Sequence, residues 1–206
     1  MLDRALEELR NGRMLLLHDA GKRENEVDMV IHASAVTPDT IRAMRKDGGG
    51  LICLAVGRDT ARKLSLPYMI ELMSRSNEVV RKLIPERTPY GDRPAFSLSV
   101  NHRDTYTGVT DRDRALTITE FAKIEGADEL TRNFYAPGHV HLLIAKTLGE
   151  RRGHTELSLE LARRAGLREA MVLCEMMSDD GDALSVGEAG EYAGERGLVL
   201  LDGGVL

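Results

Sequence analysis

The chain has 206 residues, a formal net charge of −5 and 4% aromatic residues, with no tryptophan. The length suits one large domain or two small ones. The absence of a lysine or arginine block argues against a nucleic-acid-binding protein, and no apolar run is long enough to span a bilayer. The first residues are typical of an amphipathic helix rather than a secretory signal. The two cysteines, Cys53 and Cys174, lie in apolar runs and indicate reduced, buried thiols in a cytoplasmic protein.

The first part of the chain alternates predicted helices and strands. Apolar residues at helical spacing predict a helix over 2–9, which Gly12 ends. Thr37-Pro38 is a favoured start for a second helix, which runs to about residue 46. Three glycines, 48–50, follow it and indicate a close approach of two backbones or a chain reversal. Short apolar runs predict buried strands over 14–18, 27–33 and 51–56.

The second part begins with a short predicted helix over 59–64 and a polar, proline-rich stretch, 67–94, which we expect to be an irregular, mobile loop. Thr110 or Asp111 can cap a helix, and Thr107-Gly108 and Pro137-Gly138 are typical of turns. Further elements are a helix over 155–165 and strands over 96–100, 140–144, 171–176 and 198–201, the first with its apolar residues alternating with Ser97 and Ser99. We therefore predict a single α/β (α+β) domain over residues 1–206, with a mixed β-sheet flanked by helices.

Three carboxylates and one guanidinium lie within Arg23-Glu24-Asn25-Glu26-Val27-Asp28, between two predicted strands. Carboxylates at alternate positions of an extended chain project from one face. Glu24, Glu26 and Asp28 can therefore converge on one hard cation, with Arg23 beside them for an anion. The alternative for this hexamer alone is a solvated acidic turn with a surface ion pair.

A second charged segment, Arg151-Arg152-Gly153-His154-Thr155-Glu156, directly precedes a predicted helix. The unpaired N–H groups and positive dipole end of a helix N-terminus suit a phosphate. Thr155 can cap the helix or bind an oxyanion, Arg151 can neutralise a phosphate, and His154 can bind a metal or move a proton. An ordinary capped helix with surface arginines is an equally good interpretation of this segment alone.

Glu175 ends the apolar run 171–174, where a carboxylate is costly unless it is paired or functional. The position suits proton transfer, although a solvated strand-end glutamate is a serious alternative. His139 follows a predicted turn, and a lone histidine is more often structural than catalytic. For Cys53, burial in a strand is favoured over a reactive thiol. Together the clusters predict a site with oxygen ligands for Mg²⁺ and arginines for a small phosphorylated metabolite.

In combination these segments resemble the 3,4-dihydroxy-2-butanone 4-phosphate synthase family of riboflavin biosynthesis. The matching segments cover most of the chain in the family's order: Arg23-Glu24-Asn25-Glu26-x-Asp28, Gly50-Leu51-Ile52-Cys53-Leu54, Thr107-Gly108-Val109-Thr110, Pro137-Gly138-His139-Val140, Arg151-x-Gly153-His154-Thr155-Glu156, Cys174-Glu175-Met176 and Asp179-Asp180-Gly181. The resemblance implies that ribulose 5-phosphate is converted to 3,4-dihydroxy-2-butanone 4-phosphate and formate. The implied steps are enolisation, loss of water, migration of the carbon skeleton and release of C-4.

The resemblance also implies roles for individual residues. It implies two Mg²⁺ (or Mn²⁺) ions per site, held by Glu24 and His154, with Glu26 as a further ligand or a neighbour of one. The expected substrate contacts are Arg23, Glu24, Asp28, Cys53, Thr107, Arg151, Gly153, His154, Thr155 and Glu175, with Arg151 and Thr155 near the phosphate. The expected catalytic residues are Glu175, His139 and Asp28. Glu175 is the expected first proton acceptor, and His139 or a metal-bound hydroxide is the alternative.

The family is homodimeric with sites at the subunit interface, so His139 is a candidate for the partner's site. The chain departs from the family where Ala20-Gly21-Lys22 replaces an acidic run, which bears on loop closure and metal affinity, and where Arg152 replaces a frequent glycine. Because no cyclohydrolase domain follows Leu206, we expect a monofunctional enzyme. Two alternatives stay open: another Mg²⁺-dependent sugar-phosphate enzyme, such as an isomerase or aldolase, and a non-catalytic metal- or anion-binding protein.

Overall fold

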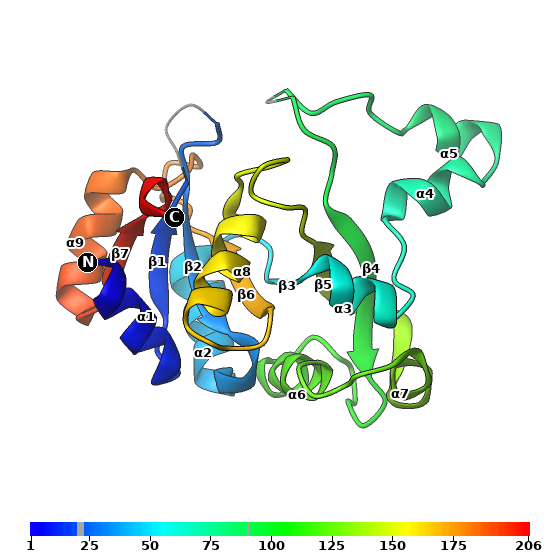
Figure 1. Cartoon of the computed structure of the whole chain (residues 1–206), viewed down its shortest axis with the longest axis horizontal. Coiled ribbons are helices and arrows are strands. Elements are labelled where there is room, and N and C mark those ends of the chain that lie inside the picture. The colour runs from blue at the N-terminus through cyan, green and yellow to red at the C-terminus, as the bar shows by residue number, and fades with distance from the viewer. Residues whose placement is uncertain (20–22, 90) are drawn as a thin grey trace.

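A computed structural model of the chain describes residues 1–19, 23–89 and 91–206. One mixed sheet of seven strands organises the described residues, in the order β4-β5-β3-β6-β2-β1-β7 (Figure 1). The strands are β1 Leu15–His18, β2 Val27–His32, β3 Cys53–Val56, β4 Phe96–His102, β5 Phe134–Ile144, β6 Ala170–Glu175 and β7 Val199–Asp202. The pairs β3–β5 and β1–β7 are parallel, and the other neighbours are antiparallel. The predicted mixed sheet is confirmed.

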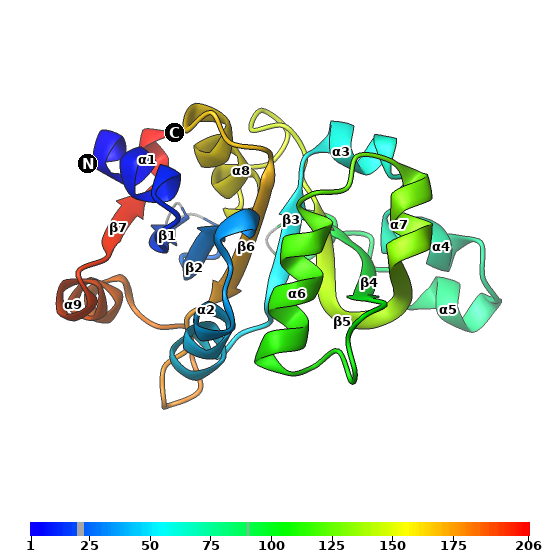
Figure 2. The same ribbon diagram turned by 90° about the horizontal axis from the view of Figure 1, so that it is seen from below.

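Helices cover both faces of this sheet (Figure 2). Leu9 and Leu161 belong to a buried apolar cluster on the face that carries α1 and α8, and Ile41 and Ile118 to a cluster on the face that carries α2 and α6. The helices are α1 Leu2–Arg10, α2 Pro38–Ala43, α3 Arg58–Lys63, α4 Met69–Ser74, α5 Glu78–Lys82, α6 Asp111–Phe121, α7 Ala127–Asn133, α8 His154–Arg164 and α9 Val186–Arg196. Among the described residues, no helix combines the length and the apolarity needed to cross a lipid bilayer.

Strand directions bring charged residues that are distant in the sequence to the same end of neighbouring strands. Because β1 and β2 are antiparallel neighbours, the segment that joins them lies where β1 ends and β2 begins. β6 runs antiparallel to β2, so its last residue, Glu175, pairs in register with Asp28. The tertiary structure therefore places the ends of two antiparallel strands beside the charged segment 23–28.

The local signals in the first part of the chain are confirmed. The Thr37 side chain accepts the N–H of Thr40 at 3.2 Å and caps α2, and Pro38 is its first residue. A π-helical turn, Met44–Gly48, continues this helix to the glycines. The N–H of Gly50 then donates to the carbonyl oxygen of Glu175 at 3.2 Å, so the glycines serve a close approach of two backbones.

The irregular loop predicted over 67–94 is only partly correct, because it contains the short helices α4 and α5. Neither helix has a buried residue. The sequence of each helix therefore lacks the periodic apolar pattern that predicts a helix. Their starts are capped locally, with Asn77 accepting the N–H of Val80 at 3.0 Å. The helices α7 and α9 were also not anticipated, and α7 likewise has no buried residue.

The turn predicted at Pro137-Gly138 is wrong, because both residues lie inside β5. The register between β4 and β5 shifts there: Val100 pairs with Val140, and the next residue of β4 pairs with Tyr135. The extra residues of β5 form a bulge, and a Cβ on Gly138 would lie 2.0 Å from the backbone of Val100. A turn signal in the sequence thus produces a bulge because the partner strand continues past it.

The alternation predicted for 96–100 is wrong at its first residues. Phe96 is 39% exposed and Ser97 is 3% exposed, the reverse of what their polarity suggests. The Ser97 hydroxyl donates to the carbonyl oxygen of Pro67 at 2.6 Å, which satisfies the buried polar group. Phe96 instead lines the cavity described below.

Candidate active site

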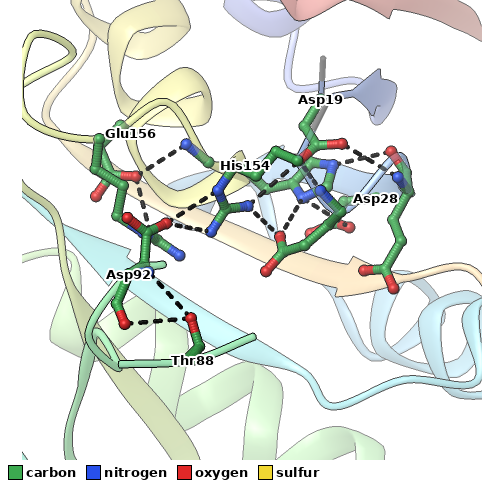
Figure 3. Close-up of polar contacts among 11 residues, drawn as sticks. Asp19, Asp28, Thr88, Asp92, His154 and Glu156 are labelled. Carbon is green, nitrogen blue, oxygen red and sulfur yellow. Dashed lines mark hydrogen bonds and ion pairs between the residues drawn. The ribbon is translucent and has the colours of Figure 1, made fainter. Parts of the chain in front are cut away.

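His154, the first residue of α8, lies at the centre of the site (Figure 3). Its ring Nε2 is 3.1 Å from the carbonyl oxygen of Glu26. Because a carbonyl only accepts hydrogen bonds, Nε2 carries a proton and Nδ1 is the nitrogen that faces the acidic groups. Nδ1 lies 3.5 Å from Asp28 Oδ1 and 3.8 Å from Glu24 Oε2. Two of the three predicted carboxylates therefore meet at this ring.

The predicted alternation of carboxylates over 24–28 is broken at Asn25, whose φ of 57° is left-handed. Glu24 and Asp28 consequently reach His154 from a bend rather than from one extended face. Glu26 contributes its backbone to the site, through the carbonyl oxygen that accepts from His154. A role for its carboxylate as a metal ligand stays a prediction.

Asp19, directly after β1, is a site residue that the sequence analysis missed. Its side chain is buried and accepts the N–H groups of Glu24 and Glu26 at 3.3 and 3.1 Å. It also forms an ion pair with Arg23 Nη1 at 3.3 Å, so Asp19 contacts three residues of the charged segment. The only signal in the sequence is an acidic residue that directly follows a buried strand. The neighbouring departure at residues 20–22 lies outside the described residues.

The donor atoms of this cluster fit a hard divalent cation. Asp19, Glu24 and His154 each offer one ligand atom, and the three atoms lie within 4.8 Å of one another. Asp28 Oδ1 faces them, and it is buried without a hydrogen-bond partner among the described residues. Carboxylate oxygens with one imidazole nitrogen suit Mg²⁺ or Mn²⁺, and a bound cation would satisfy the orphaned oxygen.

Two guanidinium groups lie beside the cluster and share the carboxylate of Asp92. Arg23 donates to Asp92 Oδ2 from Nε at 3.1 Å and from Nη2 at 2.9 Å, and Arg151 Nε donates to the same oxygen at 3.2 Å. Arg23 also contacts Glu24, and Arg151 donates to the buried Glu156 at 2.8 Å. Figure 3 shows Asp92 on the Glu156 side of this arrangement. The sequence analysis assigned no role to Asp92 or Glu156.

The N-terminus of α8 is built differently from the prediction. Gly153 rather than Thr155 is the N-cap, and its N–H donates to the Glu156 carboxylate at 3.3 Å. A Cβ on Gly153 would lie 2.9 Å from the guanidinium of Arg23, so a side chain there would displace that group. Arg152 is exposed and donates to the carbonyl oxygen of Gly203 at 3.5 Å.

These groups surround a cavity of about 240 Å³. It is lined by Glu24, Asp28, Cys53, Thr88, Pro94, Ala95, Phe96, Leu143, Arg151, His154, Thr155, Leu173 and Glu175. Seven of the predicted site residues are among them: Glu24, Asp28, Cys53, Arg151, His154, Thr155 and Glu175. The lining also includes apolar residues, which strengthens the interactions of the charged groups with a ligand.

Glu175 is held at the edge of this cavity by close packing. A Cβ on Gly50 would lie 2.5 Å from Glu175 Oε2 and 3.0 Å from both the Cβ and the carbonyl oxygen of Glu175, so a side chain there would shift the carboxylate. Cys53 and Cys174 are buried free thiols. Burial raises the pKa of Cys53 well above its usual value and that of Cys174 to about 12. The thiols are therefore protonated, which agrees with the structural interpretation of Cys53.

Burial and mutual contact determine the protonation of the metal-free cluster. Burial raises the pKa of Asp28 to about 7, with the neighbouring carboxylates adding to the effect and His154 opposing it. Burial opposes the charged form of His154, but Asp28 and Glu24 raise its pKa to about 9. Burial also opposes ionisation of Glu24, yet His154 and Arg23 lower its pKa to about 2. At neutral pH, His154 is protonated and Glu24 is ionised.

His139 and Thr107 are not among the residues that line the cavity. Both are exposed, and Thr107 donates to the Asp113 carboxylate from its N–H at 3.2 Å and from its hydroxyl at 3.3 Å. The Asn101 side chain accepts the N–H of His139 at 2.8 Å, and a Cβ on Gly108 would lie 2.0 Å from it. The structure therefore places both predicted residues outside the cavity, and Asn101 contacts both His139 and Gly108, the residue after Thr107.

Comparison with known proteins agrees with this arrangement. Residues 3–206 match the family described as 3,4-dihydroxy-2-butanone 4-phosphate synthase. The 3,4-dihydroxy-2-butanone 4-phosphate synthase of Methanothermobacter thermautotrophicus is 44% identical over 215 residues, which cover 100% of this chain and 94% of the relative. That of Methanosarcina mazei is 46% identical, over 98% of this chain and 87% of the relative. The chain belongs to the 3,4-dihydroxy-2-butanone 4-phosphate synthase family.

The predicted fold and enzyme class are thereby confirmed. A solved 3,4-dihydroxy-2-butanone 4-phosphate synthase in complex with two magnesium ions has a TM-score of 0.81 and 28% identity to this chain, covering 98% of it and 92% of the solved chain. Two magnesium ions in a member of the synthase family agree with the donor set found here. The sequence analysis had reached the same family from motifs, but it did not identify Asp19 or Asp92 as parts of the site.

Proposed function

We propose that the chain converts D-ribulose 5-phosphate into L-3,4-dihydroxy-2-butanone 4-phosphate and formate, as a step of riboflavin biosynthesis. The observation that carries this proposal is the register pair of Asp28 and Glu175 beside His154, in a cavity that two arginines flank. Proton transfer needs separate acidic and basic groups within reach of one substrate. A sugar phosphate also needs a cationic position for its phosphate and oxygen ligands for a metal.

The phosphate is bound at the N-terminus of α8. Arg151 and Thr155 line the cavity there, and Gly153 allows the close approach of the Arg23 guanidinium. Guanidinium groups bind phosphate oxygens with directed, charge-assisted hydrogen bonds, and the helix N-terminus adds its positive dipole end. This end of the cavity thus orients the sugar carbons toward Asp28 and Glu175.

Glu24 and His154, together with Asp19, would hold Mg²⁺ (or Mn²⁺), with two ions in each site. When bound, the metal supplies polarisation of the substrate's carbonyl and hydroxyl oxygens, which eases removal of a neighbouring proton. His154 keeps its Nδ1 directed at the metal position through the hydrogen bond from Nε2 to Glu26. The Glu26 carboxylate is proposed as a further ligand or as a neighbour of one.

Glu175 is the proposed first proton acceptor. It is half-buried at the end of β6, so its carboxylate reaches both the cavity and solvent. Asp28 is buried beside it, and its raised pKa of about 7 allows it to hold a proton near neutral pH. Two carboxylates in different surroundings can therefore act as base and acid. Cys53 also lines the cavity.

We further propose a cytoplasmic homodimer with its sites at the subunit interface. His139 and Thr107 lie outside the cavity of their own chain, which supports a role for them in the partner's site. In this arrangement His139 adds a second group able to transfer protons. Residues 1–206 would act as a single catalytic domain in each subunit.

The first experiment is to measure formate release from ribulose 5-phosphate with Mg²⁺ and then with EDTA. Formate that depends on metal supports the proposal. Consumption of substrate without formate would instead favour a sugar-phosphate isomerase or aldolase. Metal binding by folded protein without any turnover would favour a binding protein and remove the proposed reaction.

A further inference from the structure

Asp92 occupies the space between the two arginines of the site. Its Oδ2 accepts from Arg23 Nη2 at 2.9 Å and from Arg151 Nε at 3.2 Å. The arginine side chains are 13% and 9% exposed, so the contact is largely shielded from solvent. Two guanidinium groups that converge on one oxygen form an anion-binding position. A carboxylate from the protein's own chain occupies that position here.

Two of the other carboxylates that contact these arginines are fixed in place, and a third, Glu24, pairs with both Arg23 and His154. Asp19 is buried and accepts backbone N–H groups of residues 24 and 26, and Glu156 is buried and accepts those of residues 146 and 153. Moving either carboxylate would leave buried donors unpaired. The Asp92 carboxylate is different, because among the described residues it accepts hydrogen bonds only from Arg23 and Arg151.

Asp92 also lies outside the strands of the sheet. Asp92 lies between α5 and β4, in a stretch where the structure describes no helix or strand. Its backbone is tied to Thr88: the Thr88 N–H donates to the Asp92 carbonyl at 2.8 Å, and the Asp92 N–H donates to Thr88 Oγ1 at 3.1 Å (Figure 3). These bonds do not involve the arginines, so they do not depend on the contact between the Asp92 carboxylate and the guanidinium groups.

We propose that Asp92 is an internal competitor for the substrate phosphate. Its carboxylate holds Arg23 and Arg151 in position in the ligand-free enzyme, and a phosphate group displaces it on binding. The two anions cannot share the position, because like charges at hydrogen-bond distance from the same guanidinium groups repel each other. Asp92 thus lowers the affinity for phosphate while it keeps the arginines ordered. The identity of the displacing anion as the substrate phosphate rests on the proposed function.

The test compares wild type with Asp92→Asn by calorimetric titration with inorganic phosphate, in the presence of EDTA. Asn has the same shape without the charge, so we expect Kd for phosphate to fall about tenfold, which corresponds to about 1.4 kcal/mol. Asp59→Asn is the matched control, because it removes the same charge from an 85% exposed side chain paired with Arg62. Its Kd should equal that of wild type. Equal or weaker binding by Asp92→Asn would overturn the proposal, since it would mean that Asp92 stays in place.

A second measurement uses wild-type protein alone and does not depend on how the variant folds. A crystal structure obtained with inorganic phosphate above its measured Kd should place a phosphate oxygen between Arg23 and Arg151, with Asp92 outside hydrogen-bond distance of both. Asp92 still bound to either arginine would contradict the proposal. Both readouts are independent of turnover, so a failure to release formate would count against the proposed reaction and leave this result standing.

Discussion

Asp28 and Glu175 face each other at the last paired position of β2 and β6. One is buried, with a pKa raised to about 7, and the other is half-buried at the rim of the cavity. Burial raises the pKa of Asp28, and the charge of Glu175 adds to this effect. The antiparallel pairing of the two strands therefore provides a candidate acid and a candidate base together.

Replacing Glu175 with glutamine tests the proposed proton acceptor. We expect Glu175→Gln to retain binding of ribulose 5-phosphate but to lose about 10²–10⁴-fold in formate release, because a neutral amide cannot accept the proton. Glu120→Gln is a suitable control, since Glu120 pairs with Lys123 on the surface of α6. Wild-type turnover in Glu175→Gln would remove this residue from the mechanism.

Gly50 tests the packing that holds Glu175. In Gly50→Ala the new Cβ would lie 2.5 Å from Glu175 Oε2, so the carboxylate has to move. We expect kcat to fall at least about tenfold, and the free energy of unfolding to fall by about 1–3 kcal/mol. Gly149→Ala is the matched control, because nothing lies within 4 Å of its added Cβ. Kinetics and chemical unfolding of both variants check the prediction, which fails if Gly50→Ala retains full kcat.

Asp19 was identified only from the structure, and its contribution to metal binding is measurable. We expect Asp19→Asn to weaken Mn²⁺ binding by about 10–100-fold. The substitution replaces a negatively charged metal ligand with a neutral one and weakens the hydrogen bond that the Asp19 side chain accepts from the N–H of Glu24. Asp39→Asn controls for the lost charge, since Asp39 is 77% exposed and pairs with Arg42. Titration of the metal-free proteins with Mn²⁺ gives the affinities of wild type and of both variants. Equal affinities of wild type and Asp19→Asn would exclude Asp19 from the metal site.

The raised pKa of His154, about 9, predicts how metal affinity varies with pH. A metal needs the neutral imidazole, so binding must release the proton that His154 carries below this pKa. Affinity for Mg²⁺ should therefore rise by up to about tenfold per pH unit from pH 7 and level off near pH 9. Calorimetry in two buffers of different ionisation enthalpy would count the released protons. A flat profile in wild type would show that His154 is already neutral.

Mixed dimers test whether His139 acts in the partner's site. His139→Ala and Glu175→Gln subunits, co-expressed with different tags, would form heterodimers with one site carrying both substitutions and one site carrying neither. If His139 acts across the interface, a statistical mixture should recover about a quarter of wild-type formate release, because half of the dimers have one intact site. If His139 acts within its own chain, every site is impaired and the mixture stays inactive.

Much of this protein follows from local sequence. The helix start at Thr37-Pro38, the apolar strands and the glycine approach at 48–50 are short-range features, and the structure contains each of them. The charged segments 23–28 and 151–156 are visible in the sequence, but each alone also fits an ordinary surface segment, and only their combination with the other motifs predicts a site.

The tertiary structure alone decided which of these charges meet. The left-handed Asn25 bends the charged segment beside His154, and contacts with Arg23 bring Asp19 and Asp92 into the site. The bulge in β5 likewise arises from pairing with β4 rather than from Pro137-Gly138 itself. Local sequence determines backbone preferences over a few residues, whereas the contacts of a buried charge depend on strands and loops that pair across the whole sheet.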